Sequence, residues 1–262
     1  MRKLALFLLL ALSLCLCGCE KTPHEPEVRE INGKQYVETF YDDFDGRKLD
    51  TTKWELCPEW QRQDAGGYWD HDMISLKDGN LVVRAALKDG VPKSGAIRSR
   101  GLFSQNQGYF EIRCTLQTAK GYWFAFWLMD ENMQSVSGNG AEDGAEIDIM
   151  ESHDITGCIN HAIHWDGYEN FHKSESMIHY DPAMYEGYHT YALEWTDSEY
   201  IFYVDGVESW RTSYPGMCQN PLYLKISSEF GTWAGSYDPA ELPSDVFVDY
   251  VKVFAVAPQD AE

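Results

Sequence analysis

The chain has 262 residues, of which 44% are hydrophobic and 24% charged, which excludes a disordered or collagen-like polymer and allows a large core. Its 42 Asp and Glu outnumber 21 Lys and Arg, and the resulting net charge of −21 argues against nucleic acid as a partner. Aromatic residues make up 14% of the chain, with 9 Trp and 16 Tyr, which favours a surface that stacks on flat apolar faces of a ligand.

The N-terminus has the pattern of a targeting segment. Arg2 and Lys3 precede an apolar run that ends near Cys17 and is too short to span a bilayer comfortably, which predicts a signal peptide over residues 1–18. The Gly18-Cys19 junction resembles a bacterial lipobox, in which the cysteine is lipidated after cleavage. An ordinary secretory signal is the alternative. We therefore expect a chain held at the cell envelope through Cys19, on the surface or on the periplasmic side.

The rest of the chain divides simply. Residues 19–35 are charged and contain proline without apolar periodicity, which predicts a flexible tether. No repeat or composition break follows, so residues 36–256 are expected to form one domain and residues 257–262 a short tail. Export permits disulfides, and four cysteines allow three pairings among which the sequence does not choose. These are Cys57, Cys114, Cys158 and Cys218.

Short runs rich in Val, Ile, Tyr, Phe and Trp predict strands along the whole domain. They cover residues 80–87, 108–116, 122–129, 146–151, 159–165, 189–195, 200–204, 207–211, 222–227 and 246–254. Asp205-Gly206 predicts a tight hairpin turn between two of them. No stretch keeps an amphipathic helical period, and the last run is apolar on both faces, as in stacked sheets. The sequence therefore predicts an all-β sandwich.

The predicted strand at residues 146–151 carries three carboxylates in an otherwise apolar segment. Glu146 and Asp148 share one face, whereas Glu151 returns to that face only if a β-bulge absorbs one residue at Ile149-Met150. The outer pair can then approach to roughly 5 Å, the separation that a retaining glycosidase uses. Mutual repulsion should drive their pKa values apart, leaving one ionised nucleophile and one protonated acid. An acidic sheet edge or a metal cage is the alternative.

The segment EIDIMES resembles the catalytic signature of glycoside hydrolase family 16, in the bulged form of laminarinase-like, agarase-like and carrageenase-like members. YDDFDGRKLDTTKWEL resembles the family's opening, and SGAIRSRGLFSQNQGYFEIRCTL, GYWFAFWLM, NHAIHWDGY, HTYALEW and VDYVKVF resemble its later strands. The resemblance implies a concanavalin-like jelly roll with an open cleft. It also implies that Glu146 is the nucleophile, that Asp148 tunes it, that Glu151 is the acid/base, and that catalysis requires no cofactor.

Several residues are candidates for contact with a glycan. Alternation in GYWFAFWLM places Trp123 and Trp127 on one face, which predicts a stacking pair, with two core residues as the alternative. His161 and His164 should face opposite sides of a strand and therefore share no metal. The resemblance favours His164 as a cleft residue near Glu151, and a buried core histidine is the alternative. Further candidates from alternation and motif position are Asn106, Glu111, Arg113, Trp165 and Glu229.

The family resemblance also implies a structural calcium ion near Asp43 and Asp249, although both aspartates could instead cap turns or strands. The function predicted is an endo-acting, retaining glycosidase that works as a monomer on a neutral β-glucan (β-1,3 or mixed-linkage) or galactan. A neutral polymer is expected because a sulfated glycan would favour a basic cleft, whereas this domain is strongly acidic. A non-catalytic glycan-binding lipoprotein is the alternative. Three repelling carboxylates in one strand disfavour that alternative, because burying them costs several kcal/mol without catalytic return. The sequence does not specify which glycan is cleaved.

Overall fold

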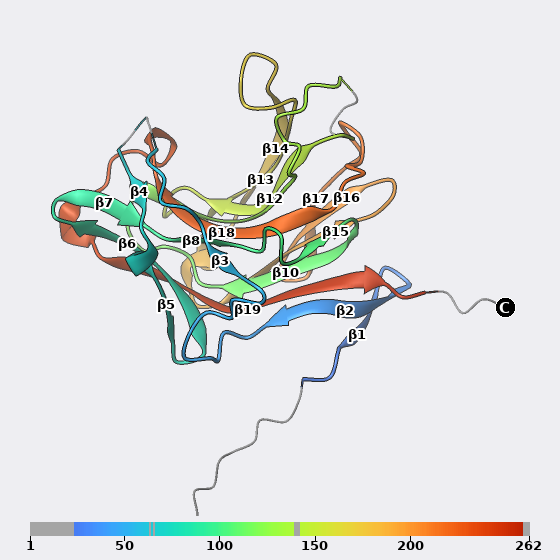
Figure 1. The fold of residues 1–262 in the computed structure, drawn as a ribbon, viewed down its shortest axis with the longest axis horizontal. Helices are drawn as coiled ribbons and strands as arrows, with labels where there is room; N and C mark the ends of the chain where they lie inside the picture. Colours follow the sequence, from blue (N-terminus) through green and yellow to red (C-terminus); the bar gives the residue numbers. More distant parts are fainter. Residues whose placement is uncertain (1–23, 63, 65, 139–141, 259–262) are drawn as a thin grey trace, which may run out of the picture.

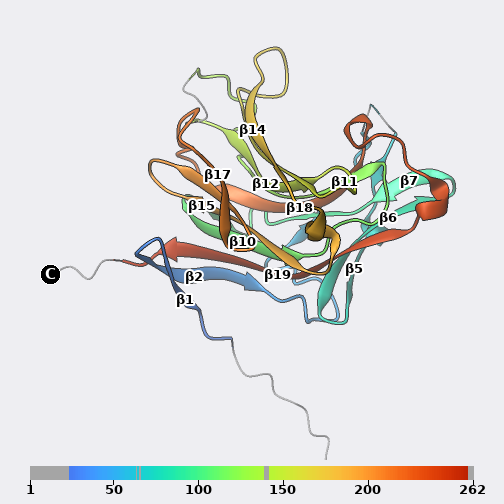
Figure 2. The same cartoon turned by 180° about the vertical axis from the view of Figure 1, so that it is seen from behind.

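The computed structural model describes residues 24–62, 64, 66–138 and 142–258, and these form two stacked β-sheets (Figures 1 and 2). The strands are β1 (Val28–Ile31), β2 (Lys34–Asp42), β3 (Glu55–Leu56), β4 (Tyr68–Trp69), β5 (Ile74–Lys77), β6 (Asn80–Lys88), β7 (Val91–Ser94), β8 (Ala96–Arg98), β9 (Ser104–Gln105), β10 (Gly108–Cys114), β11 (Tyr122–Met129), β12 (Ala145–Ser152), β13 (Cys158–Trp165), β14 (Lys173–Tyr180), β15 (His189–Trp195), β16 (Tyr200–Val204), β17 (Val207–Thr212), β18 (Leu222–Phe230) and β19 (Ser244–Val256). Short 3₁₀ turns lie at His71–Met73, Pro182–Tyr185, Thr232–Ala234 and Pro239–Glu241. The predicted β-sandwich is confirmed.

The sandwich consists of a back sheet and a cleft sheet. The back sheet has the strand order β17-β16-β15-β10-β19-β6-β7-β4, with β2 and β5 added beside β19 and β6. The cleft sheet has the order β14-β13-β12-β11-β18-β8-β3. Neighbouring strands are often far apart in sequence, as where β11 lies between β12 and β18. This arrangement brings distant segments of the chain side by side on one face of the cleft sheet.

The core lies between the sheets and follows the alternation of the strands. In β11, Phe124, Phe126 and Leu128 are fully buried in the main core, whereas Trp123 and Trp127 belong to a separate cluster on the opposite face. Burial of each large apolar side chain stabilises the fold by about 1.5–3 kcal/mol. The predicted division of this strand into a core face and an outer face is confirmed.

The ten strands expected from the sequence are all present, and each strand end lies within three residues of the predicted end. At the predicted hairpin, Asp205 and Gly206 have φ of 49° and 73°, as a tight primed turn requires. The prediction missed the short strands β3, β4, β5, β7, β8 and β9, which are too brief to show a period, the N-terminal strands β1 and β2, and the edge strand β14. β14 reads KSESMIHY, and its polar composition follows from having one edge without a partner strand.

The predicted tether ends too late. β1 and β2 form a hairpin within residues 28–42, and its turn residues Asn32 and Gly33 have φ of 48° and 75°. The Asn-Gly pair is a strong hairpin signal between short, mostly polar runs. The hairpin is fixed to the back sheet by Arg29, which donates to Glu111 at 3.0 Å. The folded body therefore begins near residue 28.

The thiols Cys57, Cys114, Cys158 and Cys218 are all free. The signal peptide and Cys19 lie outside the described residues, as do residues 259–262 of the predicted tail. Across the part of the chain that is described, no helix has the length and apolar character to cross a bilayer.

Candidate active site

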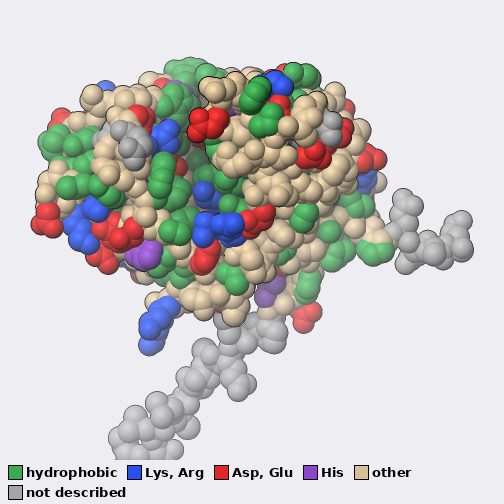
Figure 3. All heavy atoms as spheres, turned by 45° about the horizontal axis from the view of Figure 1, so that its top comes forward, with side chains coloured by type: hydrophobic (Ala, Val, Ile, Leu, Met, Phe, Trp, Pro, Cys, Tyr) green, Lys and Arg blue, Asp and Glu red, His purple; other side chains and the backbone are tan. Residues whose placement is uncertain are grey.

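A cleft of about 1200 Å³ runs over the outer face of the cleft sheet. Figure 3 shows this hollow on the face that comes forward, with hydrophobic side chains along its walls. Side chains from β8, β18, β11, β12, β13 and β14 line it, together with the loops around Trp60 and Trp233. With about 4.8 Å between neighbouring strands, a path across six strands is about 24 Å long. The cleft is therefore long enough for several sugar rings.

The three carboxylates of β12 all line this cleft. In the pairing with β11, Met150 is opposite Phe126 and Asp148 is opposite Trp127, so Ile149 is the extra residue of a bulge. The pairing with β13 shows the same shift between Asp148 and Glu151. The predicted bulge is confirmed, and it returns Glu151 to the face that carries Glu146 and Asp148.

Glu151 has the environment of a proton donor. Burial raises the pKa of the Glu151 carboxyl well above its usual range, and the charge of Asp148 raises it further. Asn160 on β13 donates a hydrogen bond to Oε2 of Glu151 at 3.0 Å, which orients the carboxyl. Burial and the charge of Asp148 therefore favour the protonated form of Glu151.

Glu146 shares this strand but has more cationic and hydrogen-bonding neighbours. Burial and the charge of Asp148 raise the pKa of Glu146 to about 7, while His164, a hydrogen bond from Tyr168 and the charge of Lys225 act in the opposite direction. Glu146 thus has more neighbours that favour its ionised form than Glu151 has. This difference in surroundings suits Glu146 to the role of nucleophile and Glu151 to that of acid.

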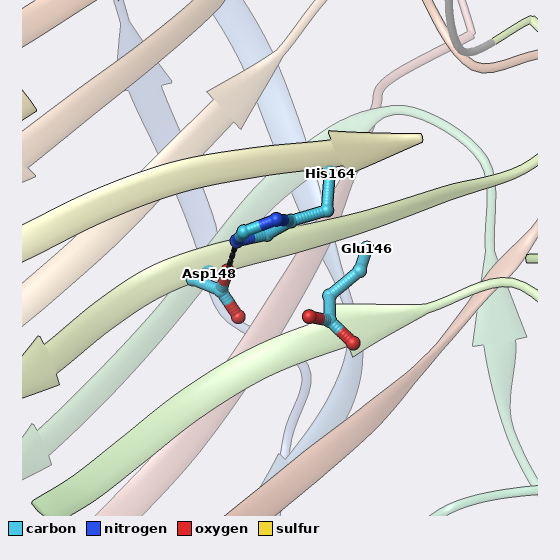
Figure 4. A group of neighbouring side chains, drawn as sticks. All are labelled: Glu146, Asp148 and His164. Atoms are coloured by element: carbon cyan, nitrogen blue, oxygen red, sulfur yellow. Dashed lines mark ion pairs between the residues drawn. The ribbon is translucent and has the colours of Figure 1, made fainter. Parts of the chain in front are cut away.

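Asp148 lies between them and contacts a histidine on the neighbouring strand (Figure 4). The Nε2 of His164 lies 3.2 Å from Oδ2 of Asp148. Burial disfavours the charged imidazole, but the hydrogen bond to Asp148 and the charges of Asp148 and Glu146 outweigh it and raise the pKa of His164 to about 9. The sequence placed His164 near Glu151, and this is wrong, because the register pairs His164 with Glu146.

Among the described residues, Glu146, Asp148 and His164 form a group that could hold a metal ion, because each offers one ligand atom within 4.8 Å of the others. Both carboxylates have a partner from the protein, because the His164 ring forms an ion pair with Asp148 and the Tyr168 hydroxyl donates to Glu146. His161 faces the opposite side of β13, as predicted, and is fully buried, with its ring nitrogens near Ile149 O at 2.6 Å and Ser209 Oγ at 2.8 Å.

The predicted tryptophan pair lies in the cleft, but each ring carries a cation. The Lys225 ammonium lies 3.6 Å from the centroid of Trp127, and the Arg62 guanidinium lies 4.7 Å from that of Trp123. One face of each indole is therefore covered. The exposed rings of the cleft are instead Trp60 and Trp233, each 44% exposed, and Tyr168, which is 43% exposed.

Glu229 also lines the cleft, where it accepts a hydrogen bond from Arg62 at 2.8 Å. Four other candidates lie elsewhere, so their prediction as cleft residues is wrong. Glu111 and Arg113 are on β10 of the back sheet. Residues alternate between core and outer faces in both sheets, so alternation alone did not show which sheet carries them. Trp165 is 2% exposed in the main core, on the face of β13 opposite His164. Asn106 lies before β10 and donates to the carbonyl of Gln219 at 2.6 Å.

The two calcium candidates do not form an oxygen-rich ligand set. Asp249 pairs with the Arg113 guanidinium, which neutralises its carboxylate. Asp43 lines a second hollow of about 440 Å³ together with Asp42, Asp45 and Asp50, and Lys48 and Lys53 also line it. Calcium takes six to eight oxygen ligands, which is more than Asp43 and Asp249 alone supply, so the calcium ion stays a prediction on which no step depends.

Several residues of the site were not expected from the sequence. Tyr168, His172 and Asn160 contact the catalytic groups, and Arg62 and Lys225 supply the cleft with positive charge. Asn160 could have been found from strand pairing, because it follows Ile159 at the start of a predicted strand next to β12. The others come from loops or from distant strands whose positions depend on the full topology.

Known proteins resemble this chain over most of its length. The model of the family described as "Glycosyl hydrolases family 16" matches residues 61–252. The chain is 29% identical to the keratan-sulfate endo-1,4-beta-galactosidase of Sphingobacterium multivorum, over 97% of this chain and 68% of that protein. It is 25% identical to the glucan endo-1,3-beta-glucosidase A1 of Niallia circulans, over 89% of this chain and 39% of that protein. It is also 25% identical to the beta-glucanase of Rhodothermus marinus, over 97% of this chain and 94% of that protein.

Solved structures share the fold. The endo-beta-1,3-glucanase from Pyrococcus furiosus superposes with a TM-score of 0.74 at 23% identity, covering 90% of this chain and 100% of that chain. The catalytic domain of a laminarinase from Thermotoga petrophila superposes with a TM-score of 0.74 at 24% identity, covering 86% of this chain and 100% of that chain. The match of the family model to most of the folded body, on a sandwich whose bulged strand carries three carboxylates in a cleft, shows that the chain belongs to glycosyl hydrolase family 16.

Proposed function

We propose that this protein is an endo-acting glycosidase that cleaves internal β-linkages of a glucan or galactan with retention of anomeric configuration. The observation that carries the proposal is the pair Glu146 and Glu151, brought to one face of β12 by the bulge and set in different surroundings. This is the arrangement that double displacement requires.

In the first step, an oxygen of Glu146 bonds to the anomeric carbon as the bond from that carbon to the leaving oxygen breaks. Glu151 gives its proton to the leaving oxygen. Formation of the ester removes the charge of Glu146, so the pKa of Glu151 falls and its carboxylate becomes a base. In the second step, water gives a proton to Glu151 and its oxygen bonds to the anomeric carbon, which releases Glu146. Asp148, held by His164, stabilises whichever neighbour is protonated.

The class of substrate is supported by the relatives and by the shape of the cleft. The relatives are named for cleavage of keratan sulfate, 1,3-β-glucan and β-glucan, which are β-linked glucans and galactans. The cleft crosses six strands, so it can hold a chain on both sides of the bond that is cleaved. The net charge of −21 favours a neutral polymer, although Arg62, Arg98 and Lys225 make the cleft itself less acidic than the surface.

A digestion panel tests the proposal. Purified protein is incubated with β-1,3-glucan, mixed-linkage glucan, unsulfated β-galactan and keratan sulfate, and products are separated by size. We expect a ladder of oligosaccharides from at least one polymer, and its loss in Glu146→Gln at a thermal midpoint no lower than that of the parent. The variant Glu186→Gln, at an exposed position outside the cleft, is the matched control. The absence of products from all four polymers would contradict the proposal, as would monosaccharide as the first product.

We also propose that the enzyme works as a monomer anchored in the cell envelope by lipid on Cys19. The support is the Gly18-Cys19 junction after the apolar run, followed by about nine residues of charged chain before β1. Membrane fractionation of cells that express the full chain tests the anchor. Parent protein should partition into detergent and Cys19→Ala should not, and identical partition of the two would contradict the anchor.

A further inference from the structure

The loop between β13 and β14, residues 166–172, sends two side chains to the catalytic strand. The hydroxyl of Tyr168 donates a hydrogen bond to Oε2 of Glu146. The His172 ring is parallel to that of His164 within 10°, with centroids 5.1 Å apart, and its Nε2 lies 2.9 Å from Nδ1 of His164. One loop therefore contacts both the nucleophile and the histidine that holds Asp148.

This loop is closed at its base. The strand pairing places Trp165 opposite Lys173, and the Lys173 ammonium lies 2.7 Å from the carboxylate of Asp166. Asp166 is buried, and Asp166 and Gly167 have φ of 60° and 74°, so the chain turns sharply as it leaves β13. Figures 1 and 2 show the loop rising beyond the sheet at the end of β13 and β14. A short, anchored loop can hold its side chains at a fixed place above Glu146.

The contacts of His164 determine where its protons lie. Nε2 faces the Asp148 carboxylate, and Nδ1 faces His172. An imidazolium has two N–H donors and satisfies both contacts, if His172 is neutral and accepts at Nε2. Burial and the charge of His164 lower the pKa of His172, which agrees with this assignment. His172 thus provides the acceptor that a charged His164 requires on the side away from Asp148.

The contact of Tyr168 selects one form of Glu146. A hydroxyl that donates to a carboxylate stabilises the ionised form and fixes the orientation of its oxygens, leaving the second oxygen for attack. The charged and titratable groups that face Glu146 come from every neighbouring element: Asp148 and Glu151 on β12, His164 on β13, Lys225 on β18, and Tyr168 itself. Among these groups, Tyr168 donates a side-chain hydrogen bond to Glu146.

We propose that Tyr168 and His172 are positioning residues of the active site, in which Tyr168 orients the Glu146 carboxylate and His172 orients His164 against Asp148. The inference rests on the proposed glycosidase function. During hydrolysis the Tyr168 hydrogen bond weakens as Glu146 becomes an ester and strengthens again as the carboxylate departs. Tyr168 therefore assists the second step as well as preparing the first.

Kinetics of Tyr168→Phe test the first half of the proposal. A hydrogen bond to a charged group corresponds to about a 10- to 100-fold effect, so kcat should fall by about that factor on whichever polymer of the digestion panel the parent cleaves. The acidic limb of the kcat/KM profile should move to higher pH, because Glu146 loses a donor that favours its ionised form. Tyr180→Phe, which removes an exposed hydroxyl from β14, is the control. A parent-like kcat and an unmoved acidic limb in Tyr168→Phe would overturn this role.

A titration without substrate tests the second half. The imidazole resonances of purified protein, followed by NMR against pH, report the pKa of His164. His172→Leu removes the acceptor and should lower that pKa by about one unit, whereas His172→Gln keeps an acceptor oxygen and should restore most of it. An unchanged His164 pKa in folded His172→Leu would overturn the role of His172. If the parent cleaves no glycan, the proposed function fails, but this titration still decides whether the loop holds His164.

Discussion

Glu146→Gln is expected to stabilise the folded protein at neutral pH while it removes activity. The Glu146 carboxyl has a pKa of about 7 in the fold and an ordinary value of 4.5, because burial and Asp148 oppose its charge. The folded state thus binds this proton more tightly than the unfolded chain does. The contribution of Glu146 to the free energy of unfolding is highest below pH 4.5 and declines as pH rises from 4.5 to 7. This contribution declines by about 2 kcal/mol between pH 5 and pH 7. The Glu146→Gln variant does not show the decline, because Gln does not ionise.

Urea unfolding at pH 5, 6 and 7 measures this difference. Parent and Glu146→Gln should have similar free energies of unfolding near pH 5, and the variant should be more stable by about 2 kcal/mol at pH 7. Glu151 is present in both proteins, so the difference between them reports the charge of Glu146. The exposed Glu186→Gln should follow the parent at every pH. A Glu146→Gln variant with the same pH dependence as the parent would refute the claim that Glu146 is a buried carboxyl with a raised pKa.

Three further predictions concern the cleft. Glu151→Gln should lower turnover by about 10²- to 10⁴-fold without changing the circular dichroism spectrum, because only the proton is lost; initial rates near those of the parent would exclude Glu151 as the acid. Asn160→Ala should move the alkaline limb of the kcat profile to higher pH, since the Asn160 amide favours ionised Glu151, and an unmoved limb would contradict that contact. Trp233→Ala should raise KM about tenfold with little change in kcat, because an exposed ring offers stacking to ground state and transition state alike, and an unchanged KM would remove it from the binding surface.

The sequence is sufficient to predict features that depend on local periodicity. Alternation in β11 separates core residues from cleft residues, and the odd spacing of Glu151 requires the bulge that the structure contains. The Asp205-Gly206 hairpin follows from backbone sterics alone. These predictions succeed because their causes lie within a few residues of the chain.

Predictions that required knowledge of distant neighbours were less successful. Trp127 is on the expected face, but Lys225 from β18 covers one side of its ring, and the strand order alone decides that contact. His164 was placed near Glu151 from the family resemblance, whereas the register of β13 against β12 sets it opposite Glu146. Tyr168 lies in a loop whose path the sequence pattern does not determine. Strand periodicity shows which face a side chain occupies, but not which strand lies beside it.

The stereochemistry of the first product tests the central claim most directly. A β-linked polymer that the protein cleaves is digested in an NMR tube at high enzyme concentration, and the anomeric proton of the new reducing end is followed from the first minute. Double displacement through Glu146 predicts that the β-anomer appears first and that the α-anomer grows only by mutarotation. Initial appearance of the α-anomer would contradict the mechanism, because it would show that water attacks the anomeric carbon directly and that Glu146 is not the nucleophile.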